Sequence, residues 1–243
     1  MRILVPVKQV ASLDEDFALD DSSGRVPEDE LDWQLNEWDT FSLEAALQLT
    51  EDGMGEVVTV SVGDEEAQDG LLSCLAKGAD RAIRVWDEDL AQLDLLGAGL
   101  DTLVVANVLA AVARRESPDL ILCGVQSSDS AGAATGVALA GLLGLTHVAV
   151  VNAIERDGDG LTVQRELEGG TVERLRLEPP ALLTVQTGIN EPRYATLRAI
   201  KQAREKPSDL VSLAELELSA DQLGANAGAI AARIAEIVKE AMG

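Results

Sequence analysis

Alternation between short apolar runs and amphipathic segments dominates the first half of the chain, and it constrains the fold more than any other feature. The run 3–7 is apolar at every position, which predicts a strand covered on both faces of a parallel sheet. A helix is expected over 39–50, where Asp39 can cap its start and Gly53 can stop it. Further strands are expected at 57–62, 82–86 and 120–123, and further helices at about 65–77 and 98–115.

Strands separated by helices in this order predict an α/β fold with a doubly wound, mostly parallel, Rossmann-like sheet that binds ligands beyond the carboxyl ends of its strands. Near residue 148 the pattern changes to short strands divided by glycine-rich turns, which predicts an antiparallel meander at about 148–185. We therefore expect a nucleotide-binding α/β domain over 1–206. The strand and helix pattern stops beyond Pro207, so 207–243 is expected to be a C-terminal arm that ends in a helix.

Charge and composition exclude several classes of function. The 43 Asp and Glu residues against 19 Lys and Arg give a net charge of −24, which disfavours nucleic acid and anionic membranes as partners. No apolar run approaches the roughly 20 residues needed to cross a bilayer, and we expect a cytoplasmic protein. Cys74, Cys123 and His147 are too few for a Cys/His zinc site or a disulfide framework.

The stretch 123–136 is the strongest candidate for a ligand site. It leaves a predicted strand, passes through Ser and Asp residues and enters a helix of small residues. Free backbone N–H groups at a helix start attract anions, and small side chains let a phosphate approach the backbone. The stretch matches neither a P-loop nor a dinucleotide fingerprint. Its small residues could equally serve only to pack the helix against the sheet.

Two other stretches carry weaker signals. Residues 36–39 precede a predicted helix, and their Asn and Asp side chains could act only as helix caps. Residues 193–206 contain five basic residues and one acidic residue, which reverses the sign of the rest of the chain. This basic island, mixed with apolar side chains, suits a protein docking surface, or alternatively a helix pinned to the acidic surface of the same chain.

Taken together, these stretches resemble the beta subunit of electron transfer flavoprotein. The resemblance covers residues 1 to about 206 in family order, and Asn190-Glu191-Pro192-Arg193-Tyr194 is its most specific part. The other matching stretches are 3–10, 36–39, 77–81, 124–126, 165–170 and 180–185.

The resemblance implies a heterodimer in which the alpha subunit holds the redox-active FAD and the beta subunit holds AMP. Such heterodimers take electrons from acyl-CoA or related dehydrogenases and pass them to a membrane quinone reductase, and the beta subunit has no catalytic residue. The nucleotide-lining positions of the family fall on Pro6, Asn36, Glu37, Trp38, Asp39, Val62, Gly124, Gln126, Ser127, Ser128, Asp129, Ser130, Ala131, Gly132, Ala133, Ala134 and Thr135. The partner-recognition loop falls on 189–203, with docking residues Glu191, Arg193, Tyr194, Leu197, Arg198, Ile200 and Lys201 and with Leu197 as the anchoring leucine.

Two alternatives stay open at this point. An electron-bifurcating relative would hold a second FAD in place of AMP and take electrons from NADH, although Thr135-Gly136 looks more like the AMP-binding loop. Relatives typically carry Asn-Pro where this chain has Asn36-Glu37, which leaves the nucleotide open. A free-standing nucleotide-binding signalling protein would explain the loop 124–135 but not 190–194.

Overall fold

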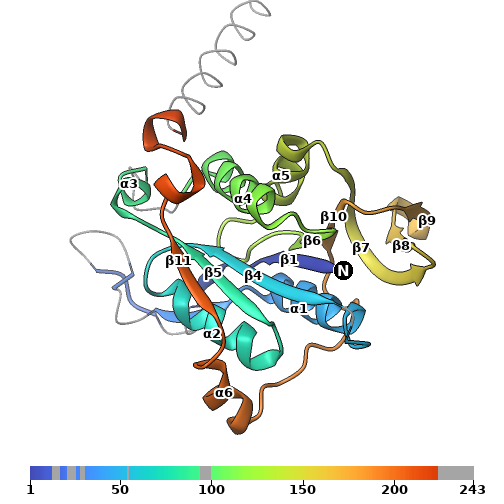
Figure 1. Cartoon of the computed structure of the whole chain (residues 1–243), viewed down its shortest axis with the longest axis horizontal. Helices are drawn as coiled ribbons and strands as arrows, with labels where there is room; N and C mark the ends of the chain where they lie inside the picture. The colour runs from blue at the N-terminus through green and yellow to red at the C-terminus, as the bar shows by residue number, and fades with distance from the viewer. Residues whose placement is uncertain (13–16, 21–25, 28–30, 54, 94–99, 224–243) are drawn as a thin grey trace, which may run out of the picture.

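The computed structural model describes residues 1–12, 17–20, 26–27, 31–53, 55–93 and 100–223. Within these residues, one nine-stranded sheet has the order β11-β5-β4-β1-β6-β10-β7-β8-β9 (Figure 1). Its strands are β1 (Arg2–Pro6), β4 (Glu56–Val62), β5 (Arg81–Val85), β6 (Leu120–Gly124), β7 (Thr146–Asp157), β8 (Gly160–Glu166), β9 (Val172–Leu177), β10 (Ala181–Val185) and β11 (Ser208–Val211).

The pairing of these strands confirms the predicted fold class. All neighbours from β11 through β7 are parallel, whereas β7, β8 and β9 pair antiparallel. The sheet is therefore doubly wound and carries an antiparallel extension at one edge. The turns that divide the extension contain Gly158, Gly169 and Gly170, all with positive φ, a backbone conformation that glycine adopts without steric cost.

Helices cover both faces of the sheet, as Figure 1 shows. One face packs on α1 (Glu37–Leu49) and α2 (Ala67–Lys77), and the other packs on α4 (Thr102–Glu116) and α5 (Thr135–Leu143). Successive side chains of β1 alternate between the two cores, with Ile3 and Val5 on the first and Leu4 on the second. The shorter helices are α3 (Glu88–Ala91), α6 (Leu197–Ala203) and the 3₁₀ turns η2 (Glu168–Gly170) and η3 (Ala214–Leu216).

The prediction of Asp39 as a helix cap is wrong. Helix α1 begins at Glu37, its N-cap residue is Asn36, and Asp39 lies buried within the first turn. The carboxyl group of Asp39 instead accepts the backbone N–H of Lys8, so a tertiary contact uses the group that a cap would have used. At the other end the helix stops at Leu49, with Thr50 as its C-cap.

Helix α4 begins at Thr102, because the side chain of Asp101 accepts the Leu103 N–H and caps it there. The helix was predicted to begin at residue 98, and residues 94–99 lie outside the described part of the chain. Its end at Glu116 follows from the left-handed conformation of Ser117, one residue before Pro118.

Two features were not expected from the sequence. Strand β11 lies beyond the predicted end of the strand and helix pattern and pairs with β5 at the sheet edge. Three of its four residues are exposed, so it carries no apolar run that would predict a strand. A small antiparallel pair, β2 (Gln9–Ser12) with β3 (Asp32–Leu35), also forms between the first predicted strand and the helix predicted over 39–50. The helix predicted at the end of the arm falls on residues 224–243, outside the described part.

Candidate functional site

A cleft of about 450 Å³ opens beyond the carboxyl ends of β1, β4 and β6. Strand β1 has β4 on one side and β6 on the other. The chain passes from β1 to β4 and β5 before it returns to β6, so the strand order reverses beside β1. Ligands of doubly wound sheets bind at such a reversal, and a volume of this size falls in the range of small-molecule sites.

The loop that joins β6 to α5 forms one wall of the cleft. Helix α5 starts at Thr135 and has no side-chain cap, so the N–H groups of its first turn lack the partners that a cap would supply. Ala131 and Ala133 both have a left-handed φ of 49°, and a Cβ at Gly132 would meet no atom within 4 Å. The Ala131 N–H donates to the Ser127 carbonyl oxygen, but the open backbone at Gly132 and the uncapped start of α5 suit an anion.

The start of α1 holds this loop in place through Asn36. The Nδ2 of Asn36 donates to the carbonyl oxygen of Gln126 at 2.8 Å, and its Oδ1 accepts the Ser128 N–H at 3.3 Å. The Asn36 side chain is 1% exposed. A buried amide that satisfies both its donor and its acceptor against one loop fixes the position of that loop relative to the helix.

Asp39 forms the floor of the cleft beside Asn36. Burial raises the pKa of its carboxyl group from 3.8 to about 7, while hydrogen bonds from the Lys8 backbone, the Asn36 side chain and the Gly124 backbone oppose that rise. A Cβ at Gly124 would collide with Oδ1 of Asp39. The close approach of helix α1 to the end of β6 therefore requires glycine at position 124.

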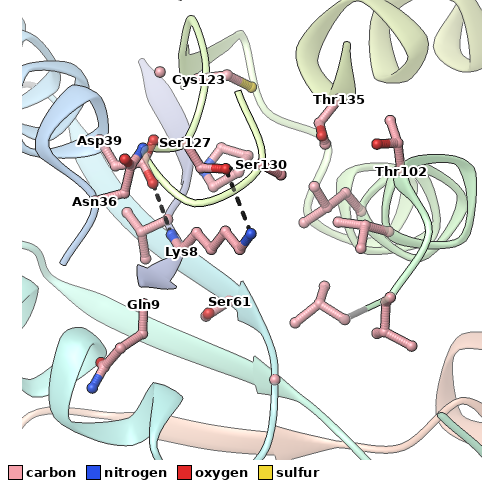
Figure 2. A pocket seen from close by; sticks show the side chains of 18 of the residues that line it. Lys8, Gln9, Asn36, Asp39, Ser61, Thr102, Cys123, Ser127, Ser130 and Thr135 are labelled. Atoms are coloured by element: carbon pink, nitrogen blue, oxygen red, sulfur yellow. Dashed lines mark hydrogen bonds between the residues drawn. The ribbon is translucent and has the colours of Figure 1, made fainter. Parts of the chain in front are cut away.

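Lys8 brings a positive charge to the cleft and is the single Lys or Arg among the described residues that line it. Its Nζ lies 2.6 Å from Oδ2 of Asp129 and 3.5 Å from Oγ of Ser127. Figure 2 shows the side chain extending across the cleft toward the loop. Burial raises the pKa of Asp129, but hydrogen bonds from Lys8 and Ser127 outweigh burial and lower it overall.

The rest of the lining combines apolar side chains with the carboxylates of Asp64, Glu66 and Asp101, and sequence reasoning missed most of it. Thr102 at the start of α4 faces the cleft near Thr135 (Figure 2). The other missed lining residues are Val7, Lys8, Gln9, Trp33, Val60, Ser61, Gly63, Asp64, Glu66, Ala67, Trp86, Leu100, Asp101, Val105 and Leu109. Most of them follow the ends of β1, β4 and β5 or begin α4, and the rule that ligands meet the carboxyl ends of strands could have indicated them.

The basic island lies apart from the cleft. Tyr194 is 96% exposed and Leu197, the first residue of α6, is 88% exposed. Glu191, Arg198, Ile200 and Lys201 are also exposed. Arg193 differs, because its guanidinium binds Glu44 and Glu51 of the same chain. The island is thus pinned to its own chain at Arg193, while its apolar residues Tyr194 and Leu197 are exposed, and its role as a docking surface stays a prediction.

The described residues contain no group of three or more His, Cys, Asp or Glu side chains that could hold a metal ion. None of the helices among them is long and apolar enough to span a membrane.

The electron transfer flavoprotein domain matches residues 24–216. The electron transfer flavoprotein subunit beta of Methylophilus methylotrophus is 49% identical over 229 residues, which cover 93% of this chain and 84% of that protein. The chain belongs to the electron transfer flavoprotein family. Beta subunits of this family from Bradyrhizobium diazoefficiens and Homo sapiens are 33% and 35% identical, over 99% and 89% of this chain and 97% and 83% of those proteins.

Most of the positions that the resemblance to electron transfer flavoproteins assigned to the nucleotide line the cleft. These are Pro6, Asn36, Asp39, Val62, Gly124, Gln126, Ser127, Ser130, Gly132, Ala133, Ala134 and Thr135. Glu37, Trp38, Ser128, Asp129 and Ala131 do not line it. Residues three apart share one side of a helix, so Asn36 and Asp39 face the cleft together. Trp38 instead donates from Nε1 to Oε1 of Gln186.

Proposed function

We propose that this chain is the beta subunit of a heterodimeric electron transfer flavoprotein. Its partner is the alpha subunit, which carries the redox-active FAD. The heterodimer takes electrons from an acyl-CoA or related dehydrogenase and delivers them to a membrane quinone reductase. The beta chain holds AMP as a structural ligand and supplies the surface that docks on the dehydrogenase. Membership of the family and a cleft at the reversal of strand order support this assignment.

The residues of the cleft fit a nucleoside monophosphate. The uncapped start of α5 offers backbone donors to a phosphate, and the ammonium group of Lys8, which pairs with Asp129 here, lies within the same cleft. The apolar part of the lining, which includes Val62, Trp86 and Val105, offers a surface for a base. AMP has no redox chemistry, so its contribution is to stabilise the folded state, which alone has this cleft.

Cofactor content tests the assignment directly. The native heterodimer is purified gently, its chains are identified by mass, and FAD and AMP are released and counted. One FAD and one AMP per heterodimer are expected. Two FAD and no AMP would instead identify an electron-bifurcating relative, and a stable monomer without an alpha subunit would contradict the assignment.

The phosphate position is tested at Thr135, the first residue of α5. Thr135→Glu places a carboxylate where the helix start attracts an anion, so AMP is expected to be lost through charge repulsion and steric exclusion. Released AMP is measured by chromatography, with the circular dichroism spectrum as a check of folding. Thr135→Gln is the matched control for side-chain size. Full AMP occupancy in a folded Thr135→Glu heterodimer would show that the phosphate lies elsewhere.

The docking surface is tested at Leu197, which in the family inserts into an apolar pocket of the dehydrogenase. An apolar anchor at the centre of a small contact carries most of its affinity, so Leu197→Ala should slow dehydrogenase-coupled reduction about tenfold or more. Arg198→Gln and Lys201→Gln should cause smaller losses that shrink as salt is raised, because rim charges act mainly on the encounter rate. FAD content should stay constant. If Leu197→Ala shows unchanged turnover at a subsaturating concentration of the heterodimer, this surface does not dock on the dehydrogenase.

A further inference from the structure

An ionic clasp joins helix α1 to the segment that precedes α6. Arg193 donates from Nε to Oε2 of Glu44 at 2.7 Å and from Nη2 to Oε1 of Glu44 at 2.9 Å. The backbone N–H of Arg193 also donates to Oε2 of Glu44, at 3.2 Å. Three hydrogen bonds from Arg193 thus converge on one carboxylate, beside a fourth from Nε2 of Gln48, and two of the three form the bidentate pairing that fixes both distance and orientation.

Glu44 is the inner partner of the clasp. Its side chain is 5% exposed, whereas that of Arg193 is 36% exposed. Burial raises the pKa of Glu44, but the hydrogen bonds from Arg193 outweigh burial and lower it overall, so the carboxylate is charged at neutral pH. A buried carboxylate without its partner is strongly unfavourable. Arg193 is therefore held at this position and does not act as a free surface charge.

The clasp holds a segment that has little other regular structure. Residues 190–196 belong to no helix or strand. Besides the clasp, Asn190 donates from Nδ2 to the carbonyl oxygen of Phe41 in α1 at 3.1 Å, and Ile189 and Ala195 pack against the core. Thr196 then caps α6 by accepting the Ala199 N–H. The exposed side chains of the segment thus start from points fixed on α1.

We propose that Glu44 is a positioning residue: through Arg193 it holds the segment 190–196 in one conformation, so that Tyr194 and Leu197 are presented to a partner protein before contact. This inference rests on the proposed docking role of Leu197. A preformed surface avoids the loss of conformational entropy on binding, which improves affinity without adding a contact. The fitting partner surface is an apolar pocket with an acidic rim, because α6 carries exposed Arg198 and Lys201 within one turn of exposed Leu197.

Glu51 provides a matched control, since it is a second carboxylate on the same arginine. It lies 2.8 Å from Nη2 of Arg193, yet its side chain is 62% exposed. A solvent-exposed pair contributes little to stability. Loss of the Glu51 pair should therefore leave the segment in place, whereas loss of the Glu44 pair should release it.

The experiment compares Glu44→Gln, Arg193→Lys and Glu51→Gln in the intact heterodimer. For Glu44→Gln and Arg193→Lys, hydrogen exchange of the amides in 193–203 should become faster, and the heterodimer concentration that half-saturates the dehydrogenase should rise about tenfold. The limiting rate at saturation should stay unchanged, because a displaced segment alters docking and not electron transfer. Glu51→Gln should stay within about twofold of the unsubstituted protein in both measurements. Unchanged FAD and AMP contents show that each variant is folded.

Two results would overturn the inference. Unchanged exchange in both Glu44→Gln and Arg193→Lys would show that the clasp does not order the segment. Suppose that exchange becomes faster but the half-saturating concentration stays unchanged, while Leu197→Ala does raise that concentration. This result would show that the presentation of Leu197 to the dehydrogenase does not depend on the clasp. If Leu197→Ala has no effect either, the docking role itself fails, and faster exchange still supports the ordering of the segment by Glu44.

Discussion

The carboxyl group of Asp39 joins the two backbone segments that bound the floor of the cleft. Its Oδ2 accepts the Lys8 N–H at 2.8 Å, and the Gly124 backbone also donates to it. Lys8 follows β1 and Gly124 ends β6. One buried side chain of α1 therefore fixes the distance between the ends of β1 and β6, where the strand order reverses.

We expect Asp39 to make the stability of the fold depend on pH. Because burial raises its pKa from 3.8 to about 7, the folded chain holds a proton between these values that the unfolded chain has lost. The resulting stabilisation is complete below about pH 4 and is lost as the pH rises through about 7, and it amounts to at most about 4 kcal/mol. Asp39→Asn retains an acceptor oxygen and removes this titration.

The measurement compares thermal unfolding midpoints of the heterodimer with and without Asp39→Asn from pH 5 to pH 8. The unsubstituted protein should lose stability relative to the variant as the pH rises. Glu37→Gln, which removes an exposed carboxylate of the same helix, serves as the control and should follow the unsubstituted profile. Parallel profiles for Asp39→Asn and the unsubstituted protein would contradict the assignment.

Among the elements, α1 contacts both the cleft and residues 190–196. Its start carries Asn36 and Asp39 at the cleft, and its later turns carry Phe41 and Glu44, which hold residues 190–196. Its buried residues place it firmly against the sheet. A rigid helix between two sites keeps them in a constant relative position, and loops alone could not do so.

Helix α5 approaches the sheet closely because its second residue is Gly136. A Cβ there would lie 2.7 Å from Cγ2 of Thr184 in β10 and 3.3 Å from Cβ of Cys123 in β6. Gly136→Ala should therefore displace the start of α5, lower the stability by about 1–3 kcal/mol and reduce AMP occupancy. Urea unfolding and released AMP measure the two effects.

A second glycine of α5 is the control for this prediction. A Cβ at Gly141 would meet no atom within 4 Å, so Gly141→Ala should be neutral or stabilising by up to about 1 kcal/mol through helix propensity. Thr184→Ser removes Cγ2 and keeps the hydroxyl that accepts the Val150 N–H. Adding it to Gly136→Ala should restore part of the stability. Equal losses at Gly136 and Gly141 would show that the close approach to β10 is not the cause.

At the scale of the whole molecule, charge is distributed unevenly. The chain has a net charge of −24, yet the basic island carries exposed Arg198, Lys201 and Arg204. Two other members of the island are used internally, since Arg193 binds Glu44 and Lys206 donates to the carbonyl oxygens of Leu75 and Ala79. The exposed charges belong to the same stretch of chain as exposed Leu197, which is the arrangement expected if this surface docks an acidic partner as proposed.

The sequence by itself determined the fold class and the approximate location of the cleft. Apolar runs and helical spacing predict the parallel strands, because a strand buried on both faces must be apolar at nearly every position. Glycine-rich turns predict the antiparallel extension, because the residues that form a tight turn are neighbours in the sequence. Strand β11 escaped prediction since its exposed residues leave no such local signal.

Only the tertiary structure decided which side chains meet. Asp39 has the sequence signature of a helix cap but serves as a buried acceptor for Lys8, and Arg193 has the signature of a surface charge but pairs with Glu44. Lys8 and Thr102 reach the same cleft although 94 positions separate their numbers in the sequence. Spacing along the chain encodes local backbone conformation, whereas the partners of a polar side chain depend on which distant segments the packed core brings within hydrogen-bond distance.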